Sequence, residues 1–308
     1  MRLGDKVSVW LGLGAFVASA RLMAGSAVAG YGRGDPWQIG LQSPVTSIAR
    51  DNEAFNTPLV WGMVAISLFV MGLLLYVMLR FNSKANPTPS HNHHNTLLEV
   101  AWTVAPILIL LVIAIPSFKG LFAQYSYPKP DVIIKATGNQ WFWSYDYADT
   151  KGVSFDSYML KDEETQALRD KGVDAPRLLS VDNEIVVPIN KVVHVLVTSK
   201  DVIHSWAVLS FASRTDGVPG RVSSTWFKAE RAGVYYGVCS ELCGKDHAFM
   251  PIAVRVVSED VYAKWLDVRK AGGKGVDDKA RALIQASISV PNQSVAAAAG
   301  AGTPVQTP

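Results

Sequence analysis

The residues best suited to bind a metal ion lie together in one short segment, residues 239–250. It reads Cys-Ser-Glu-Leu-Cys-Gly-Lys-Asp-His-Ala-Phe-Met and contains the only two cysteines among the 308 residues of the chain. Thiolate and imidazole groups favour copper, zinc or an iron–sulfur cluster over magnesium or calcium. The thioether of the methionine shifts this preference toward copper. The segment therefore predicts a site for a soft metal ion.

The two cysteines could instead form a disulfide, which is common in exported domains. A bridge between Cys239 and Cys243 would close only a very short loop, and it would leave His247 and Met250 without a role. The spacing of these four residues would also fit one face of a helix. The residues on either side resemble strands, however, so we expect a loop between two strands that can surround a metal ion.

A site of this kind requires one more side chain, and the other histidines are the candidates. Three of the six histidines lie in the loop 80–96, between two apolar segments that are long enough to cross a membrane. We expect this loop to lie on the other side of the membrane from the cysteines and its histidines to be solvated. His194 falls within an expected strand, where an ordinary hydrogen-bonded histidine is expected. His204 begins the run His-Ser-Trp-Ala-Val after a turn. Because a side chain at a strand end is easily directed at a neighbouring loop, we expect His204 to be the ligand.

The number of donors leaves the identity of the metal open. Two cysteines and two histidines would suit a tetrahedral zinc ion. A mononuclear blue-copper site uses one cysteine, two histidines and a weak methionine, so one thiolate would be left over. Two copper ions bridged by both thiolates would use every donor, with one histidine and one weak ligand for each ion. Such a pair can share one electron, which limits the change of geometry on reduction.

The composition of the chain indicates membrane-spanning segments. Charged residues make up 18% of the sequence, below the average of about 25% for soluble proteins. The mean hydropathy is +0.17. The formal net charge of +3 is too small to predict a nucleic-acid partner.

Residues 1–29 resemble a secretory signal peptide. Two basic residues precede the apolar run Val7–Val17, and Ala-Val-Ala at 27–29 matches an Ala-x-Ala cleavage site. The alternative is a first transmembrane anchor, but an arginine and two glycines interrupt it. We expect cleavage, which leaves an exported N-terminal segment at 30–56.

Two further apolar segments, Leu59–Leu79 and Leu97–Phe118, have the roughly 20 residues that a helix needs to cross a bilayer. We therefore expect a transmembrane helical hairpin at 57–122. After a cleaved signal peptide the N-terminus is outside, so the connecting loop is cytoplasmic and the rest of the chain is outside again. The two basic residues of the loop agree with this orientation.

Glu99 is the one ionisable residue of the second span. An ionisable group within a span is a candidate for function, often in proton movement. Glu99 lies only about one turn inside the expected boundary, however, and its side chain could extend to water. The sequence alone leaves both interpretations open.

From residue 123 to 271 short β-rich runs alternate with turns, which predicts an all-β sandwich or barrel. An amphipathic helix is expected from Ser258 to Trp265. Residues 272–308 are rich in Gly, Ala, Gln and Pro, and we expect a low-complexity, largely disordered tail. The expected strands are Val132–Thr137, Gln140–Tyr147, Ile185–Ile189, Val192–Ser199, Arg221–Glu230, Val234–Val238 and Pro251–Val257.

The second of these strands is rich in aromatic residues. Trp141, Trp143, Tyr145 and Tyr147 alternate, so in a strand they would share one face. Such a face most often belongs to the core or to a membrane interface. A more specific interpretation is an aromatic contact through which an electron is received.

Several segments resemble subunit II of haem–copper cytochrome c oxidases of the bacterial or mitochondrial type, and they occur in the same order as in that family. The resemblance runs from the hairpin through residue 257, and its most specific part is the metal segment with its flanks. The matching segments are Leu98–Pro106, Gly138–Tyr147, Ser154–Met159, Asp201–Val208, Pro219–Arg221 and Tyr235–Pro251.

The resemblance implies a two-helix transmembrane hairpin followed by an all-β cupredoxin-like Greek-key barrel with a dinuclear copper centre called CuA. The side chain of Glu241 would contact a magnesium or manganese ion at the boundary with subunit I. The implied copper ligands are the side chains of His204, Cys239, Cys243, His247 and Met250 and the backbone carbonyl of Glu241.

The resemblance also implies roles for single residues outside the metal segment. Trp141 would accept the electron from cytochrome c, and Glu99 would stand at the entrance of a proton-uptake path into subunit I. No Cys-x-x-Cys-His motif is present, so no haem is expected on this chain. The acidic residues placed to dock cytochrome c are Asp146, Asp149, Asp156 and Asp201, although the domain as a whole is not acidic.

The implied function is that of the electron-accepting subunit of a proton-pumping cytochrome c oxidase in the bacterial inner membrane. Subunit I, subunit III and cytochrome c would be its partners, and the copper domain would lie on the periplasmic side. The alternatives are a tethered copper carrier, a module like that of nitrous-oxide reductase, or a structural zinc module. The hairpin and Glu99 favour the oxidase, because a tether needs only one span and no buried acid.

Overall fold

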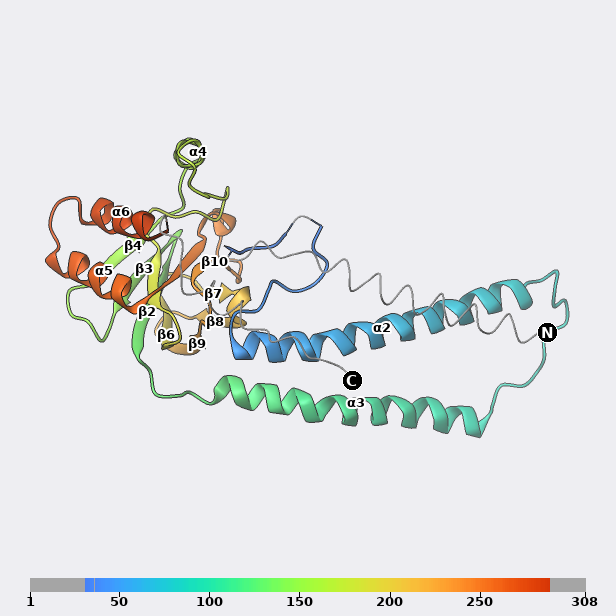
Figure 1. The fold of residues 1–308 in the computed structure, drawn as a ribbon. Helices are drawn as coiled ribbons and strands as arrows, with labels where there is room; N and C mark the ends of the chain where they lie inside the picture. The colour runs from blue at the N-terminus through green and yellow to red at the C-terminus, as the bar shows by residue number, and fades with distance from the viewer. Residues whose placement is uncertain (1–30, 36, 289–308) are drawn as a thin grey trace, which may run out of the picture.

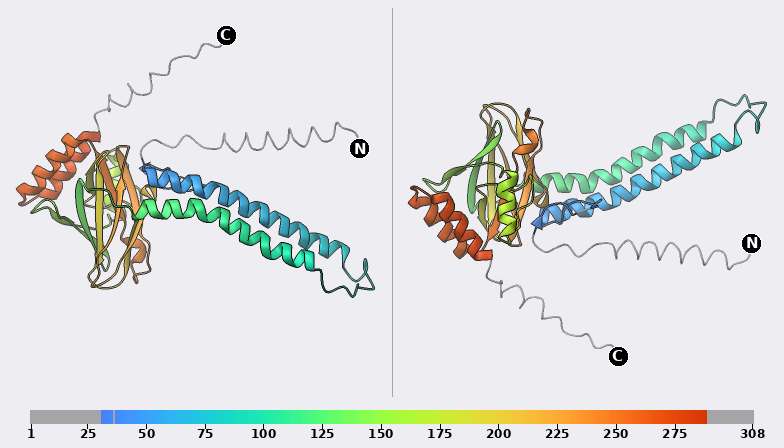
Figure 2. Two further views of the ribbon diagram at one scale, coloured as in Figure 1. Left: turned by 90° about the horizontal axis from the view of Figure 1, so that it is seen from below. Right: turned by 90° about the horizontal axis from the view of Figure 1, so that it is seen from above.

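The computed structural model describes residues 31–35 and 37–288 (Figure 1). The expected signal peptide at 1–29 and the last twenty residues of the expected tail lie outside the described residues. The described chain forms a pair of long helices, a β domain and a C-terminal helical pair (Figures 1 and 2).

The two long helices are α2 (Ser47–Arg80) and α3 (Thr96–Tyr125). Each begins at a side-chain cap: Thr46 Oγ1 accepts a hydrogen bond from the Ala49 N–H at 3.0 Å, and Asn95 Oδ1 accepts one from the Leu98 N–H at 3.2 Å. Both are long and apolar enough to cross a membrane, and their large apolar side chains are exposed along most of their length. They lie side by side and extend away from the β domain (Figure 2).

The β domain consists of two sheets. One has the strand order β4-β3-β2-β6-β9, and the other has the order β5-β11-β10-β7-β8, with the short β1 (Tyr31–Gly32) paired to β10. The core between them contains Trp143, Trp206 and Phe227. The bounds are β2 Val132–Asn139, β3 Phe142–Tyr147, β4 Ser154–Ser157, β5 Ile185–Pro188, β6 Val192–Ser199, β7 His204–Val208, β8 Ser213–Gly217, β9 Ser223–Lys228, β10 Gly233–Cys239 and β11 Ile252–Val257.

The predicted fold class is confirmed: two apolar helices precede a β domain of two packed sheets. The expected strand Val192–Ser199 matches β6 at both ends. Four of the other expected strands contain the observed β3, β5, β9 and β11, and the expected strands Val132–Thr137 and Val234–Val238 lie within the longer β2 and β10. The short strands β4 and β8 and the helix α4 (Asp162–Asp170) were not expected. Strand β8, Ser-Arg-Thr-Asp-Gly, has no apolar alternation, and it is held by its pairing with β7.

The first part of the predicted low-complexity tail, which begins at residue 272, contains a helix that was not expected. Residues Val276–Ile288 form a helix, α6, that packs against α5 (Glu259–Ala271). Ala280 and Ile284, four residues apart and therefore on one face, are buried, and the Arg281 guanidinium donates to the Asp182 carbonyl at 2.6 Å. The Gly and Ala content obscured this short apolar face. The two helices cover the side of the β domain opposite the long hairpin (Figure 2).

Trp265 anchors this helical pair, and its substitution gives a test of the packing. Its side chain is fully buried, with its ring 5.2 Å from that of Tyr147. We expect Trp265→Ala to lower the free energy of unfolding by about 3–5 kcal/mol, because a large cavity remains in the core. Denaturant unfolding of the purified chain measures this change. Lys264→Ala, at the exposed neighbouring position, is the control, and an equal effect of both variants would contradict the packing role.

Candidate metal centre

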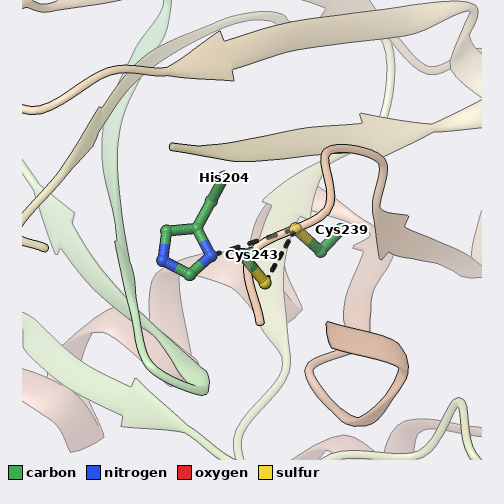
Figure 3. Close-up of side chains that lie close together, drawn as sticks. All are labelled: His204, Cys239 and Cys243. Carbon is green, nitrogen blue, oxygen red and sulfur yellow. Dashed lines mark hydrogen bonds between the residues drawn. The ribbon is translucent and has the colours of Figure 1, made fainter. Parts of the chain in front are cut away.

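The metal segment forms the connection between two paired strands, as expected. Strand β10 ends at Cys239, a loop and the short 3-10 helix η2 (His247–Phe249) follow, and β11 begins just after Met250. Strands β10 and β11 are antiparallel neighbours. The end of β10 also pairs with β7, in a register that sets Cys239 opposite Trp206. Since His204 is the first residue of β7, this register brings its imidazole next to the cysteines (Figure 3).

All the donor groups implied by the resemblance converge on the two cysteine sulfurs. His204 Nδ1 lies 3.9 Å from Cys239 Sγ, and the Glu241 carbonyl oxygen lies 3.3 Å from the same sulfur. His247 Nδ1 is 3.5 Å and Met250 Sδ 3.6 Å from Cys243 Sγ. The loop therefore surrounds one small volume from several sides, as the sequence predicted.

The two cysteines are free thiols in this structure. Their sulfurs are 3.9 Å apart, far beyond the roughly 2.05 Å of a disulfide bond. The ligand atoms of His204, Cys239 and Cys243 all lie within 4.8 Å of one another (Figure 3). Two thiolates, two imidazoles and a thioether at such distances fit copper or zinc, and they do not fit magnesium or calcium.

Most of the donor set is shielded from water. His204 is 0%, Met250 1%, Cys243 4% and Cys239 5% exposed, whereas His247 is half-buried. The opposite sheet supports the loop, because Trp143 Nε1 donates a hydrogen bond to the Met250 carbonyl at 3.2 Å. The Ser205 N–H points at Cys239 Sγ at 3.5 Å. A buried donor set with little freedom favours a metal ion held in fixed geometry.

The two thiols lie in different electrostatic environments. Burial opposes ionisation of Cys239, but hydrogen bonds with His204 and with backbone groups outweigh it and lower the pKa of Cys239 to about 7. Burial and the neighbouring Cys239 raise the pKa of Cys243 to about 12. Burial lowers the pKa of His204, but its contacts with Cys239 and Asp201 outweigh this, so the pKa lies above its ordinary value. Cys239 is therefore the more readily ionised thiol.

Trp141 lies beside the metal segment, although not in the strand where it was expected. The residue falls in the turn that precedes β3, and only Trp143, Tyr145 and Tyr147 belong to the buried face of that strand. Trp141 is half-buried, and its Nε1 donates a hydrogen bond to the Cys243 carbonyl at 3.2 Å. The other three aromatics are core residues, while Trp141 reaches from the surface to the metal loop.

The four acidic residues considered for docking differ in their surroundings. Asp146, Asp149 and Asp156 are exposed, and Asp156 accepts a hydrogen bond from Ser144 Oγ at 2.7 Å. Asp201 is turned toward the domain, where its carboxylate contacts His204 Nε2 at 2.9 Å. Residue types and spacing did not indicate this difference, because it depends on the turn before β7.

Two other histidines occupy defined positions. His194 Nε2 contacts the Pro128 carbonyl at 2.7 Å, so this residue is the ordinary hydrogen-bonded histidine that we expected. His94, which we expected to be simply solvated, is exposed but contacts Glu99 through Nδ1 at 2.8 Å. Glu99 lies in the first turn of α3, which the connecting loop joins to α2. The spacing of five residues across a helix start could have indicated this pair.

Comparisons with known proteins match both parts of the chain. The family model for the transmembrane domain of cytochrome c oxidase subunit II matches residues 34–119, and the model for its periplasmic domain matches 132–257. A probable cytochrome c oxidase subunit 2 from Rickettsia bellii is 45% identical over 245 residues, which cover 79% of this chain and 89% of the relative. Cytochrome c oxidase subunit 2 from Cereibacter sphaeroides is 41% identical over 278 residues, 84% of this chain and 91% of the relative.

A solved structure is similar to part of the chain. It is the crystal structure of the periplasmic domain of subunit II of cytochrome oxidase from Bradyrhizobium japonicum, 53% identical, with a TM-score of 0.42. The matched region covers 47% of this chain and 96% of the chain in that crystal structure.

The unequal thiols of the metal-free chain can be tested by alkylation. In Cys243→Ser, which retains only Cys239, we expect the rate of reaction with iodoacetamide to rise with a midpoint near pH 7, because the thiolate is the nucleophile. In Cys239→Ser, which retains only Cys243, burial keeps the thiol protonated, so the reaction should need a clearly higher pH. Mass spectrometry of the intact chain measures both. Equal midpoints would show that the two environments are alike.

Proposed function

The chain belongs to the cytochrome c oxidase subunit II family, and we propose that it is the electron-accepting subunit of a proton-pumping oxidase. The observation that carries this proposal is the convergence of both imidazoles, the Met250 thioether and the Glu241 carbonyl on the two cysteine sulfurs. A mononuclear blue-copper site requires only one thiolate, and this site has two. The second thiolate supports the dinuclear CuA centre.

The chain would hold two copper ions through the side chains of His204, Cys239, Cys243, His247 and Met250 and the carbonyl of Glu241. A centre of this type accepts single electrons from cytochrome c and delivers them to haem in subunit I. The residues of the loop exclude water and fix the donor groups. Fixed ligands limit the reorganisation that accompanies each change of charge.

Trp141 is the proposed point at which the electron is received from cytochrome c. Its half-buried indole is joined through a 3.2 Å hydrogen bond to the carbonyl of Cys243, which is itself a proposed ligand. This contact forms a short path from the surface to a thiolate. The exposed Asp146, Asp149 and Asp156 are the acidic groups proposed to dock cytochrome c.

The remaining proposals concern the boundary with the membrane partners. The half-buried Glu241 side chain would contact a magnesium or manganese ion shared with subunit I. Subunit III is a further proposed partner.

The two apolar helices are long enough to cross a bilayer, which we propose to be the bacterial inner membrane. The β domain would lie in the periplasm and the α2–α3 loop in the cytoplasm.

Loading the purified metal-free chain with copper tests the proposed centre. Electron paramagnetic resonance should give a mixed-valence signal spread over two copper nuclei. Cys239→Ser or Cys243→Ser should abolish this signal and cytochrome c oxidation by the complex, because one bridging thiolate is lost. A chain that binds only zinc, or that gives a signal from one copper, would contradict the dinuclear centre.

Glu99→Ala tests the proposed entrance for protons. Glu99 lies at the end of α3 remote from the β domain, so copper reduction by cytochrome c should be unchanged while steady-state turnover slows. Stopped-flow reduction and oxygen consumption measure the two quantities. Turnover equal to that of the unmodified oxidase would mean that Glu99 merely extends to water.

A further inference from the structure

Asp201 lies in the turn between β6 and β7, and both oxygens of its carboxylate are engaged with the domain. Oδ1 contacts His204 Nε2 at 2.9 Å and accepts the Val202 N–H at 2.6 Å. Oδ2 accepts the N–H of Gln140 at 2.7 Å. The side chain is 31% exposed. The carboxylate is thus directed at two separate parts of the chain.

The first part is the ligand His204. Its ring presents Nδ1 to Cys239 Sγ and Nε2 to Asp201, so the carboxylate accepts the Nε2 proton and leaves Nδ1 free to bind a metal. On the side of strand β2 the ring packs directly against Gly138, where a Cβ atom would lie 2.7 Å from the ring. The backbone of Gly138 on one side of the ring and the Asp201 carboxylate at Nε2 together fix the orientation of the His204 imidazole.

The second part is the Gln140–Trp141 turn. Gln140 Nε2 and Trp141 Nε1 both donate to the Cys243 carbonyl, each at 3.2 Å. The backbone N–H of Gln140 is held from the other side by Asp201. The turn is therefore fixed at two points, one on the metal loop and one on the residue that orients His204.

We propose that Asp201 is a positioning residue that fixes His204 and the Gln140–Trp141 turn relative to each other. This inference rests on the proposed function, because it assigns a further residue to the same site. It differs from a docking role in its physical requirement. Docking of a cationic partner depends on the negative charge, whereas positioning depends on hydrogen-bond acceptance by both oxygens.

Two substitutions separate these requirements. Asp201→Ala removes both acceptors and the charge. Asp201→Asn also removes the charge, but its amide oxygen can still accept from His204 and Val202, while its NH2 group cannot accept from Gln140. A docking role predicts the same effect for both variants. A positioning role predicts a larger effect for Ala, with His204 retained in place by Asn.

The copper-loaded full-length chain and the assembled oxidase serve as the test. For Asp201→Ala we expect an altered two-copper resonance spectrum, roughly tenfold weaker copper retention against a chelator and a lower kcat with cytochrome c. For Asp201→Asn we expect a spectrum close to that of the unmodified chain, with kcat reduced because the turn has lost one of its two attachments. If Asp201→Ala does not fold, the reduced kcat of Asp201→Asn at saturating cytochrome c carries the test.

Asp146→Asn is the matched control for charge, because it removes an exposed carboxylate of the same domain that makes no contact with the proposed ligands among the described residues. Its effect should be confined to KM and to the dependence on ionic strength. If both Asp201 variants behave like this control, the positioning role is refuted. An unmodified chain without a two-copper signal would instead refute the proposed function, and this inference with it.

Discussion

The candidate metal centre depends on the antiparallel pairing of β7 with the last residues of β10. This pairing sets Val238 opposite Ala207 and Cys239 opposite Trp206. The strands approach each other so closely that a Cβ atom at Gly237 would lie 2.2 Å from the Ala207 carbonyl oxygen. A side chain at this position would separate the strands, and the imidazole at the start of β7 would move away from the thiolate at the end of β10.

Both sheets hold the metal loop. Strands β7 and β10 of one sheet supply His204 and Cys239, while β3 of the other supplies Trp143, which binds the Met250 carbonyl. The rings of Trp143 and His204 also meet edge to face, with centroids 6.0 Å apart. The site is thus part of the main core, and its geometry is as rigid as the packing between the sheets.

Much of this arrangement could be predicted from the sequence. Local signals sufficed for the two apolar helices, for β6 and for a metal loop between β10 and β11, because apolar runs, alternation and the clustering of Cys, His and Met are visible within short windows. His204 was also predicted, from its place at a strand end. Its proximity to Cys239 is set by the order of strands in the sheet, which no local pattern encodes.

Three of the features that the sequence analysis missed are held by contacts with other elements of the fold. The polar strand β8 exists through its pairing with β7, and α6 exists through its packing on α5. The inward orientation of Asp201 requires the N–H of Gln140, which lies 61 residues away. The helix and strand propensities of the residues contain no information on such partners, which follow only from the topology of the fold.

The separation of the donors along the chain has a consequence for the stability of the domain. Cys239, Cys243, His247 and Met250 lie within one hairpin, whereas His204 precedes Cys239 by 35 residues. An ion bound to both parts would link β7 to the hairpin in the folded domain. Since such an ion binds the folded arrangement of donors far better than the unfolded chain, its binding free energy adds to the free energy of unfolding. The residues proposed to bind copper would in this way also stabilise the folded β domain.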